Sequence, residues 1–185
     1  MRFDPESPFY RTLEACGRVE GEDLALQLVY DHREVAKLIW PGPEANGRPF
    51  RIGSTVLHYA ALSGYDRLAY ALLDEGADVN ACDAAWYRSV LSWAAFNAHC
   101  STLKLLLSHG ANPKSFDAMH AAARGGEMKG KGKEQEYIDA LKILIKAGAN
   151  KNDRMNSFRR TPLAAAKLAG HTGAIEYLKS IGAEE

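Results

Sequence analysis

Apolar residues in the middle of the chain are spaced for pairs of short helices. Two sets with helical spacing follow one another, namely Leu57, Ala60 and Ala61, and then Leu68, Leu72 and Leu73. Thr55 precedes the first set and is a favoured residue for capping a helix start. Gly64 and Gly76 follow the two sets, where glycine easily adopts the positive φ that often ends a helix. The pattern predicts two helices joined by a tight turn.

The same pattern returns along the chain. In three copies the interval from a capping Thr or Ser to a closing glycine is identical: Thr55 to Gly76, Ser89 to Gly110 and Thr161 to Gly182. A fourth copy, Asp117 to Gly148, is longer, and we assign the excess to an insertion near residues 127–136. The second helices of the later copies carry matching apolar sets, namely Leu103, Leu106 and Leu107, then Ala140, Leu141, Leu144 and Ile145, then Ala174, Ile175 and Leu178.

A degenerate copy precedes these four. Counting back from Gly42 by the same interval places its start at Gly21, with Val35, Leu38 and Ile39 in phase. We also expect a leading helix near residues 7–16.

A single helix pair cannot bury its apolar side alone, so neighbouring pairs must stack to form a core. We therefore expect an all-α solenoid of helix–turn–helix units joined by hairpin loops, with four recognisable repeats after a degenerate N-terminal capping repeat. The units form one domain, residues 1–185. Its parts are residues 1–53 (N-terminal cap and degenerate repeat), 54–87, 88–116, 117–159 with the insertion, and 160–185 (C-terminal capping repeat).

The motif TVLHYAA at residues 55–61, followed by Gly64, Leu72-Leu73 and GADVN at residues 76–80, resembles the ankyrin repeat. The resemblance covers about residues 21–185 and implies an ankyrin-repeat solenoid that binds a partner protein. It implies that His58 and His120 form hydrogen-bonding struts between neighbouring loops. It also implies that Asn80 bridges loop backbone. The family usually has glycine two residues before Ser89, where this chain has Tyr87. A bulky residue is unfavourable at positive φ, so we expect that loop to be rerouted.

Ankyrin proteins bind through the finger loops between units and through the exposed side of the first helices. Mapping that surface onto this chain selects twelve candidate partner-binding residues: Arg51, Ile52, Leu62, Trp86, Tyr87, Arg88, Phe96, Asn97, Phe116, Arg124, Phe158 and Arg160. Trp, Tyr and Arg dominate interface hot spots, and arginine pairs well with carboxylates. We therefore expect a partner with an acidic and apolar surface. The alternative is that the aromatic residues pack between adjacent fingers and the arginines are solvated.

Composition limits the function classes. Lys+Arg and Asp+Glu both number 23, so the chain lacks the basic excess of a dedicated nucleic-acid binder. The three cysteines have no zinc-site spacing, and we expect them to be reduced in a cytoplasmic protein, or a nuclear one if the source is a eukaryote. We expect no signal peptide, because the start lacks a charged region followed by an apolar run, and no membrane segment, because no stretch has the apolar length that a span needs. We also expect no cofactor.

No catalytic motif stands out, and most of the six histidines fall at repeat-phased positions. We therefore predict a non-catalytic protein-binding module, monomeric on its own, that serves as an adaptor, an inhibitor or an immunity-type protein. One alternative is a targeting or regulatory subunit of a larger enzyme complex. A weaker one is a nucleic-acid binder that uses arginine and aromatic residues of the fingers. The Gly/Lys-rich insertion is either a solvated loop or a second contact.

Overall fold

The computed structural model describes residues 6–18, 21–41, 52–115, 117–125, 132–154 and 159–185. Within these residues the chain forms ten α-helices and one 3-10 helix, and no β-strand. The helices are α1 (Pro8–Cys16), α2 (Glu22–Asp31), η1 (Arg33–Lys37), α3 (Val56–Ser63), α4 (Asp66–Asp74), α5 (Val90–Phe96), α6 (Cys100–Ser108), α7 (Ala118–Arg124), α8 (Glu134–Lys146), α9 (Pro162–Ala169) and α10 (Thr172–Ser180).

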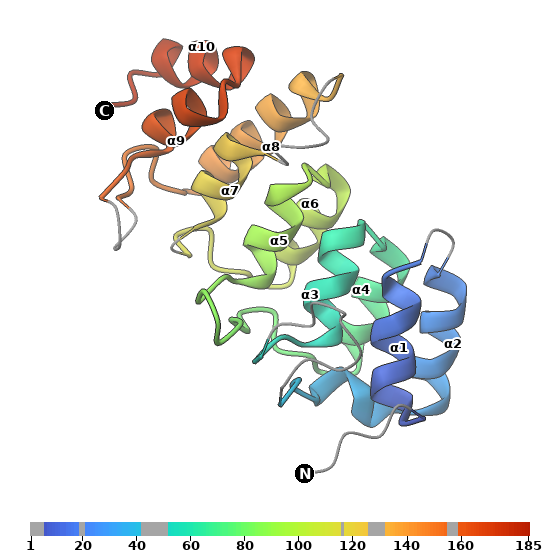
Figure 1. The fold of residues 1–185 in the computed structure, drawn as a ribbon. Coiled ribbons are helices and arrows are strands. Elements are labelled where there is room, and N and C mark those ends of the chain that lie inside the picture. The colour runs from blue at the N-terminus through green and yellow to red at the C-terminus, as the bar shows by residue number, and fades with distance from the viewer. Residues whose placement is uncertain (1–5, 19–20, 42–51, 116, 126–131, 155–158) are drawn as a thin grey trace.

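The helices stack in two rows along the molecule, with the two termini at opposite ends (Figure 1). The inner row is α1, α3, α5, α7 and α9, and each packs on the next. The outer row is α2, α4, α6, α8 and α10, and each also packs on the inner helix that precedes it. This arrangement confirms the predicted all-α solenoid of stacked helix pairs.

The capping residues act as the sequence pattern predicts. The side chains of Ser89 and Thr161 each accept a hydrogen bond from the backbone N–H three residues later, at 3.2 Å in both cases. Ser7 does the same for α1 at 3.4 Å. All four closing glycines have a positive φ between 70° and 99°: Gly76, Gly110, Gly148 and Gly182. These residues set where each helix begins and ends.

Leucines of the outer row lie in the centre of the core. The fully buried ones are Leu68, Leu72, Leu103, Leu106, Leu141, Leu144 and Leu178. Leu57 and Leu91 of the inner row are also buried, so the two rows share one apolar layer. Burial of one such side chain stabilises the fold by roughly 2 kcal/mol. One residue of each second-helix set is only partly buried, namely Leu73, Leu107, Ile145 and Ile175.

The predicted start of the degenerate first copy is wrong, because the helix after Gly21 is not the inner helix of its pair. Gly21 does precede a helix, but that helix, α2, is the outer member of a pair whose inner member is α1. The leading helix predicted near residues 7–16 is therefore the inner helix itself. Leu38 and Ile39, predicted to be in phase with core positions, are exposed.

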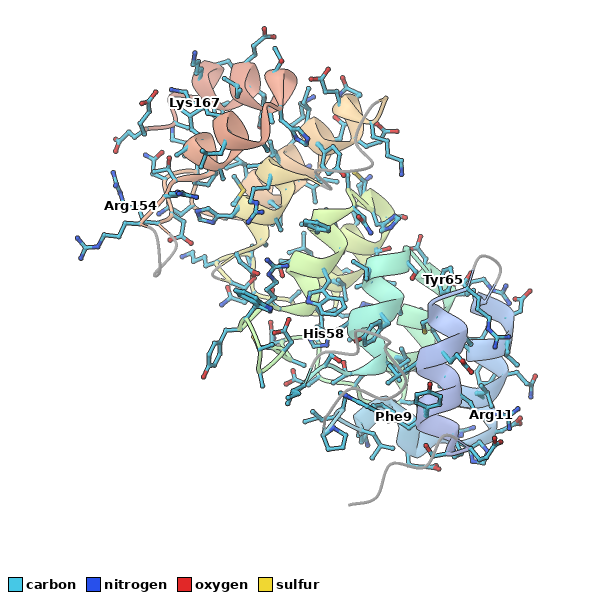
Figure 2. All side chains as sticks on the ribbon, viewed as in Figure 1. Phe9, Arg11, His58, Tyr65, Arg154 and Lys167 are labelled. Carbon is cyan, nitrogen blue, oxygen red and sulfur yellow. The ribbon has the colours of Figure 1, made fainter. Side chains whose placement is uncertain are left out.

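The segment after α2 explains why the spacing misled. Val35 is buried in the short turn η1, and the chain then extends so that Trp40 N donates to Ser54 O at 2.7 Å. The Trp40 side chain is buried and stacks on Phe9, with ring centroids 6.2 Å apart. Trp40 thus fills the place in the core that we gave to Leu38 and Ile39. Figure 2 shows Phe9 on α1 beside this segment.

Carboxylates tie the outer helices together. Glu22 Oε1, on α2, accepts hydrogen bonds from the backbone N–H groups of Arg67 and Leu68 at the start of α4, at 3.0 and 3.2 Å. Glu134 on α8 does the same for Gly173 N of α10, at 3.1 Å. Each carboxylate caps the helix of the next unit, where N–H groups have no partner inside their own helix.

Two of the three residues to which the resemblance gives a scaffold role, His120 and Asn80, bridge to the next unit, whereas the hydrogen bond of His58 stays within its own unit. His120 Nε2 lies 2.8 Å from the carbonyl oxygen of Arg160, which confirms a strut to the next loop. The Asn80 side chain bridges to the next unit, because its Nδ2 donates to Gly110 O at 3.2 Å and its Oδ1 accepts from Asn112 N at 2.8 Å. His58 Nδ1 accepts from Thr55 N at 3.1 Å, inside its own unit.

The end of the predicted insertion is helical. Residues 134–136 form the first turn of α8, which makes this outer helix longer than its counterparts. The part of the insertion at residues 127–131 lies outside the described residues.

A candidate partner-binding site on the inner helices and finger loops

A buried carboxylate holds the finger loop between α4 and α5. Asp83 has no exposed surface, and its Oδ1 accepts from Trp86 N at 2.7 Å. Its Oδ2 accepts from the indole Nε1 of Trp93 on α5, at 3.2 Å. The backbone also closes on itself, since Asp83 N donates to Arg88 O at 3.0 Å. Both oxygens of this carboxylate therefore have partners, and the loop is fixed to α5.

Tyr87 keeps the backbone conformation that we expected it to avoid. Its φ is 53°, in the region where the family uses glycine, so our prediction of a rerouted loop is wrong on this point. The hydrogen bond from Tyr87 N to Asp83 O, at 3.0 Å, holds it there. The side chain is 77% exposed and its neighbour Trp86 is 66% exposed. Two large aromatic side chains thus project from this finger into solvent.

A hollow of about 250 Å³ lies beside this finger on the inner helices. We call it the larger hollow, because a smaller one adjoins it on the inner helices; a hollow of about 480 Å³ lies on the outer helices α2, α4 and α6. Its walls come from α3, α5 and α7 and from the finger: Tyr59, Leu62, Arg88, Ser92, Trp93, Phe96 and Ala121. The rings of Tyr59 and Trp93 meet edge to face, with centroids 5.1 Å apart. The hollow is large enough for one bulky side chain of a partner.

The repeat register explains why the hollow is there. Tyr59, Trp93 and Ala121 occupy the same position of successive units, four residues after the cap, and Leu62, Phe96 and Arg124 lie one helical turn further on. Residues three apart share a helix face, so these two rows form the inner surface. Alanine at position 121 leaves space opposite the two aromatic side chains of α5. The hollow therefore lies where the row changes from bulky residues in α3 and α5 to alanine in α7, and the last unit also has alanine at this position, Ala165.

A second, smaller hollow of about 20 Å³ shares Arg88, Phe96 and Ala121 with the first. Its other walls are Asp117, His120 and Arg124. Asp117 is buried, and its Oδ2 lies 3.9 Å from Arg88 Nε. Burial raises the pKa of this carboxyl from 3.8 to about 6, although Ser92, Arg88 and the Ser89 backbone lower it. Most Asp117 side chains are therefore ionised at neutral pH.

The structure brings four of the predicted site residues together. Leu62, Arg88, Phe96 and Arg124 line the two hollows. Trp86 adjoins them, because the Arg88 guanidinium carbon lies 5.9 Å from the centroid of its ring.

Three further candidates lie at the margins. Ile52 lies on the preceding finger and its side chain is exposed. Its backbone carbonyl accepts a hydrogen bond from Ala84 N at 2.8 Å. Asn97 donates to Leu62 O at 2.7 Å, so its amide also serves the scaffold. Arg160 is exposed, and its carbonyl receives the His120 strut. Predicted residues Arg51, Phe116 and Phe158 lie outside the described residues.

Sequence reasoning missed several residues that shape the site. Tyr59 and Trp93 line the larger hollow, although both stand inside motif positions that we read as scaffold. Asp83 and Asp117 are buried carboxylates, one under the finger and one in the smaller hollow. The sequence does mark Asp117 as unusual, because it stands where the other units have Thr or Ser.

The described part of the chain lacks two other types of site. There, His, Cys, Asp and Glu side chains form no group of three or more that could hold a metal ion. Among the same residues, no helix has the length and apolar character needed to cross a membrane.

Comparison with known proteins identifies the repeats. The family model for ankyrin repeats, in three copies, matches residues 57–130, which include both hollows and the Trp86 finger. Residues 57–130 of this chain are ankyrin repeats.

Two curated mouse proteins are similar to this chain. The B-cell lymphoma 3 protein homolog is 32% identical over 120 residues, which cover 62% of this chain and 24% of the relative. Rabankyrin-5 is 29% identical over 196 aligned residues, covering 89% of this chain and 17% of the relative. The chain thus spans less than a quarter of the length of either relative. Ankyrin repeats mediate protein–protein interaction, but the fold alone names no partner.

Proposed function

We propose that this protein is a non-catalytic module that binds a partner protein through its inner helices and finger loops. The observation that carries the proposal is the continuity of the site. The exposed Trp86 and Tyr87 lead through Arg88 into a hollow walled by the aromatic side chains of α3 and α5. Exposed aromatic residues beside a pocket are typical of interface hot spots.

The charges around the hollows indicate the chemistry of the partner. Arg88 and Arg124 line the smaller hollow and are partly exposed, whereas Asp117 in the same hollow and Asp83 under the finger are buried. A partner therefore meets guanidinium groups first, and each offers several N–H donors in a planar fork suited to carboxylates. With the apolar walls of the larger hollow, this arrangement favours a partner surface that combines carboxylates with large apolar side chains.

The role of such a module is that of an adaptor, an inhibitor or an immunity-type protein. The alternative that we keep is a targeting or regulatory subunit of a larger enzyme complex. Both use the same binding surface, and they differ in what the bound partner does.

A pair of matched double variants tests the site. Trp86→Ala/Tyr87→Ala removes the two exposed aromatic residues of the finger. Tyr30→Ala/Tyr70→Ala removes two exposed aromatic residues of the outer helices α2 and α4. The experiment is affinity capture from the native lysate with quantitative mass spectrometry. The finger variant should capture at most one-tenth as much of the main partner as the original protein does, which corresponds to a loss of roughly 1.4 kcal/mol or more of binding free energy. The outer variant should retain it.

Both variants should unfold at temperatures close to the original, because exposed side chains contribute little to stability. Equal partner loss in both variants, or loss in the outer variant alone, would contradict the proposed site.

A further inference from the structure

Asp117 stands at a helix-capping position but does not cap. In the units on either side, Ser89 and Thr161 accept a hydrogen bond from the N–H three residues on. The side chain of Asp117 makes no such bond to α7, although aspartate is among the best capping residues. A residue that breaks the local rule without a gain to the fold marks a candidate functional position.

The surroundings leave its carboxylate without a hydrogen bond. Neither oxygen has a hydrogen-bond partner among the described residues, and the side chain is 93% buried. The Ser92 hydroxyl and the Ser89 backbone are near enough to lower the pKa of Asp117, but neither makes a hydrogen bond of full geometry to its oxygens. The Ser92 hydroxyl donates to Ser89 O instead, at 2.9 Å. Arg88 Nε is 3.9 Å away, too far for a hydrogen bond. Asp83, which is fully buried under the finger, has partners on both oxygens. Asp117 therefore has free acceptor capacity that faces the smaller hollow.

The larger hollow supplies a matching space for a ring. Tyr59, Trp93 and Phe96 form aromatic walls, and Ala121 leaves the side towards α7 open. Aromatic side chains favour offset and edge-to-face contacts of the kind that Tyr59 and Trp93 already make. Because the two hollows share Arg88, Phe96 and Ala121, a ring seated in the larger one can direct its polar tip towards Asp117.

We propose that these hollows receive one tyrosine or tryptophan side chain of the partner protein, with its O–H or N–H donating a hydrogen bond to Asp117. The inference rests on the proposed function and names the residue type at its centre. Phenylalanine would fill the space but leave the buried carboxylate without a donor. Lysine or arginine would bring a cation next to Arg88 and Arg124. An aromatic ring with a neutral donor satisfies both constraints, and carboxylates elsewhere on the partner can pair with the arginines.

The test is a display selection of random 12-residue peptides on the immobilised full-length protein. Enriched peptides should share a Tyr or Trp. In fluorescence polarisation, its replacement by Phe (for Trp, by naphthylalanine, which lacks the N–H) should weaken binding about 10-fold or more, as expected for a lost hydrogen bond to a charged group.

Two variants of the protein locate the contact. Ala121→Phe fills the hollow and should abolish binding of the enriched peptides. Asp117→Thr restores the capping residue of the other units, and should bind the Tyr and Phe forms of one peptide within about twofold of each other. Thermal unfolding checks both variants, and Asp117→Thr should be at least as stable as the original because a buried carboxylate is replaced by a cap.

The outcomes separate the two proposals. Enriched peptides that bind Ala121→Phe as well as the original, or that require Lys or Arg, overturn the aromatic pocket. If such peptides still lose binding in Trp86→Ala/Tyr87→Ala, the proposed function stands. Failure of any peptide to enrich overturns the pocket, and the capture experiment with the native partner then decides the proposed function alone.

Discussion

Three described residues that carry a Cβ adopt left-handed backbone: Tyr87, Ala98 and Arg159. Ala98 takes the turn between α5 and α6, where the neighbouring unit has Gly64. Tyr87 and Arg159 both stand two residues before a helix cap, where Gly53 serves the unit of α3. In these units the positive φ is kept whether or not the residue is glycine, whereas Ser115, two residues before Asp117, does not adopt it. A residue with a Cβ there costs about 1–2 kcal/mol relative to glycine.

Tyr87→Gly tests that strain. Relief of the left-handed backbone should raise the free energy of unfolding by about 1 kcal/mol, after the greater freedom of glycine in the unfolded chain is considered. Urea denaturation monitored by circular dichroism measures it.

Tyr87→Ala is the matched control, since it removes the same exposed ring but keeps the Cβ. It should show no such gain. An equal gain in both variants would mean that the ring itself, and not the backbone, is unfavourable.

At the scale of elements, the outer helices depend on carboxylates supplied by the preceding unit. Glu22→Ala should lower the free energy of unfolding by about 1 kcal/mol, as does the loss of an ordinary helix cap, because two N–H groups of α4 lose their acceptor. Chemical denaturation measures the difference.

Asp23→Ala is the control for that prediction. Asp23 is the next residue, and it pairs with the Arg67 side chain at 2.7 Å in an exposed position. Exposed pairs contribute little, so this variant should change stability by less than about 0.5 kcal/mol. The idea fails if Asp23→Ala is the more harmful of the two.

Most elements could be predicted from the sequence because their signals are local. The caps Ser89 and Thr161, the closing glycines and the leucine spacing each require only one helix pair. The first pair could not be phased by counting, because its fit rests on Trp40, which returns from an extended segment to pack on Phe9. Asp117 shows the same limit at the site. Its residue type can be read from the sequence, but the failure of its side chain to cap α7 depends on how α5 packs against α7.

At the scale of the whole molecule, two buried groups give stability opposite dependences on pH. Burial lowers the pKa of His58 from 6.5 to about 4, opposed by Asp83, by the carbonyls of Arg88 and Ala81 and by Asp78. Between pH 6.5 and 4, His58 is therefore protonated in the unfolded chain but remains neutral in the folded state. Acidification through this range thus lowers the free energy of unfolding. Asp117 does the reverse. Its folded pKa of about 6 exceeds the ordinary 3.8, so acidification from pH 6 to 4 favours the folded state.

Each effect amounts to roughly 3 kcal/mol across its window, so the two largely offset one another. Asp117→Asn removes one of them. Between pH 6 and 4, the free energy of unfolding of Asp117→Asn should fall more steeply than that of the original protein. Urea denaturation at each pH measures both. Other titrating groups are common to both proteins and cancel in the comparison. Parallel curves would show that Asp117 titrates near its ordinary value.

The two-row stack also determines how the molecule responds to tension. The main contacts of each helix are with its own partner and with the adjacent units, so none of the described helices links one end of the array directly to the other. Stretched between its termini, such an array is compliant, because small rotations between successive units add up. Under higher load it gives way one helix pair after another, and a single-molecule extension trace records a series of steps.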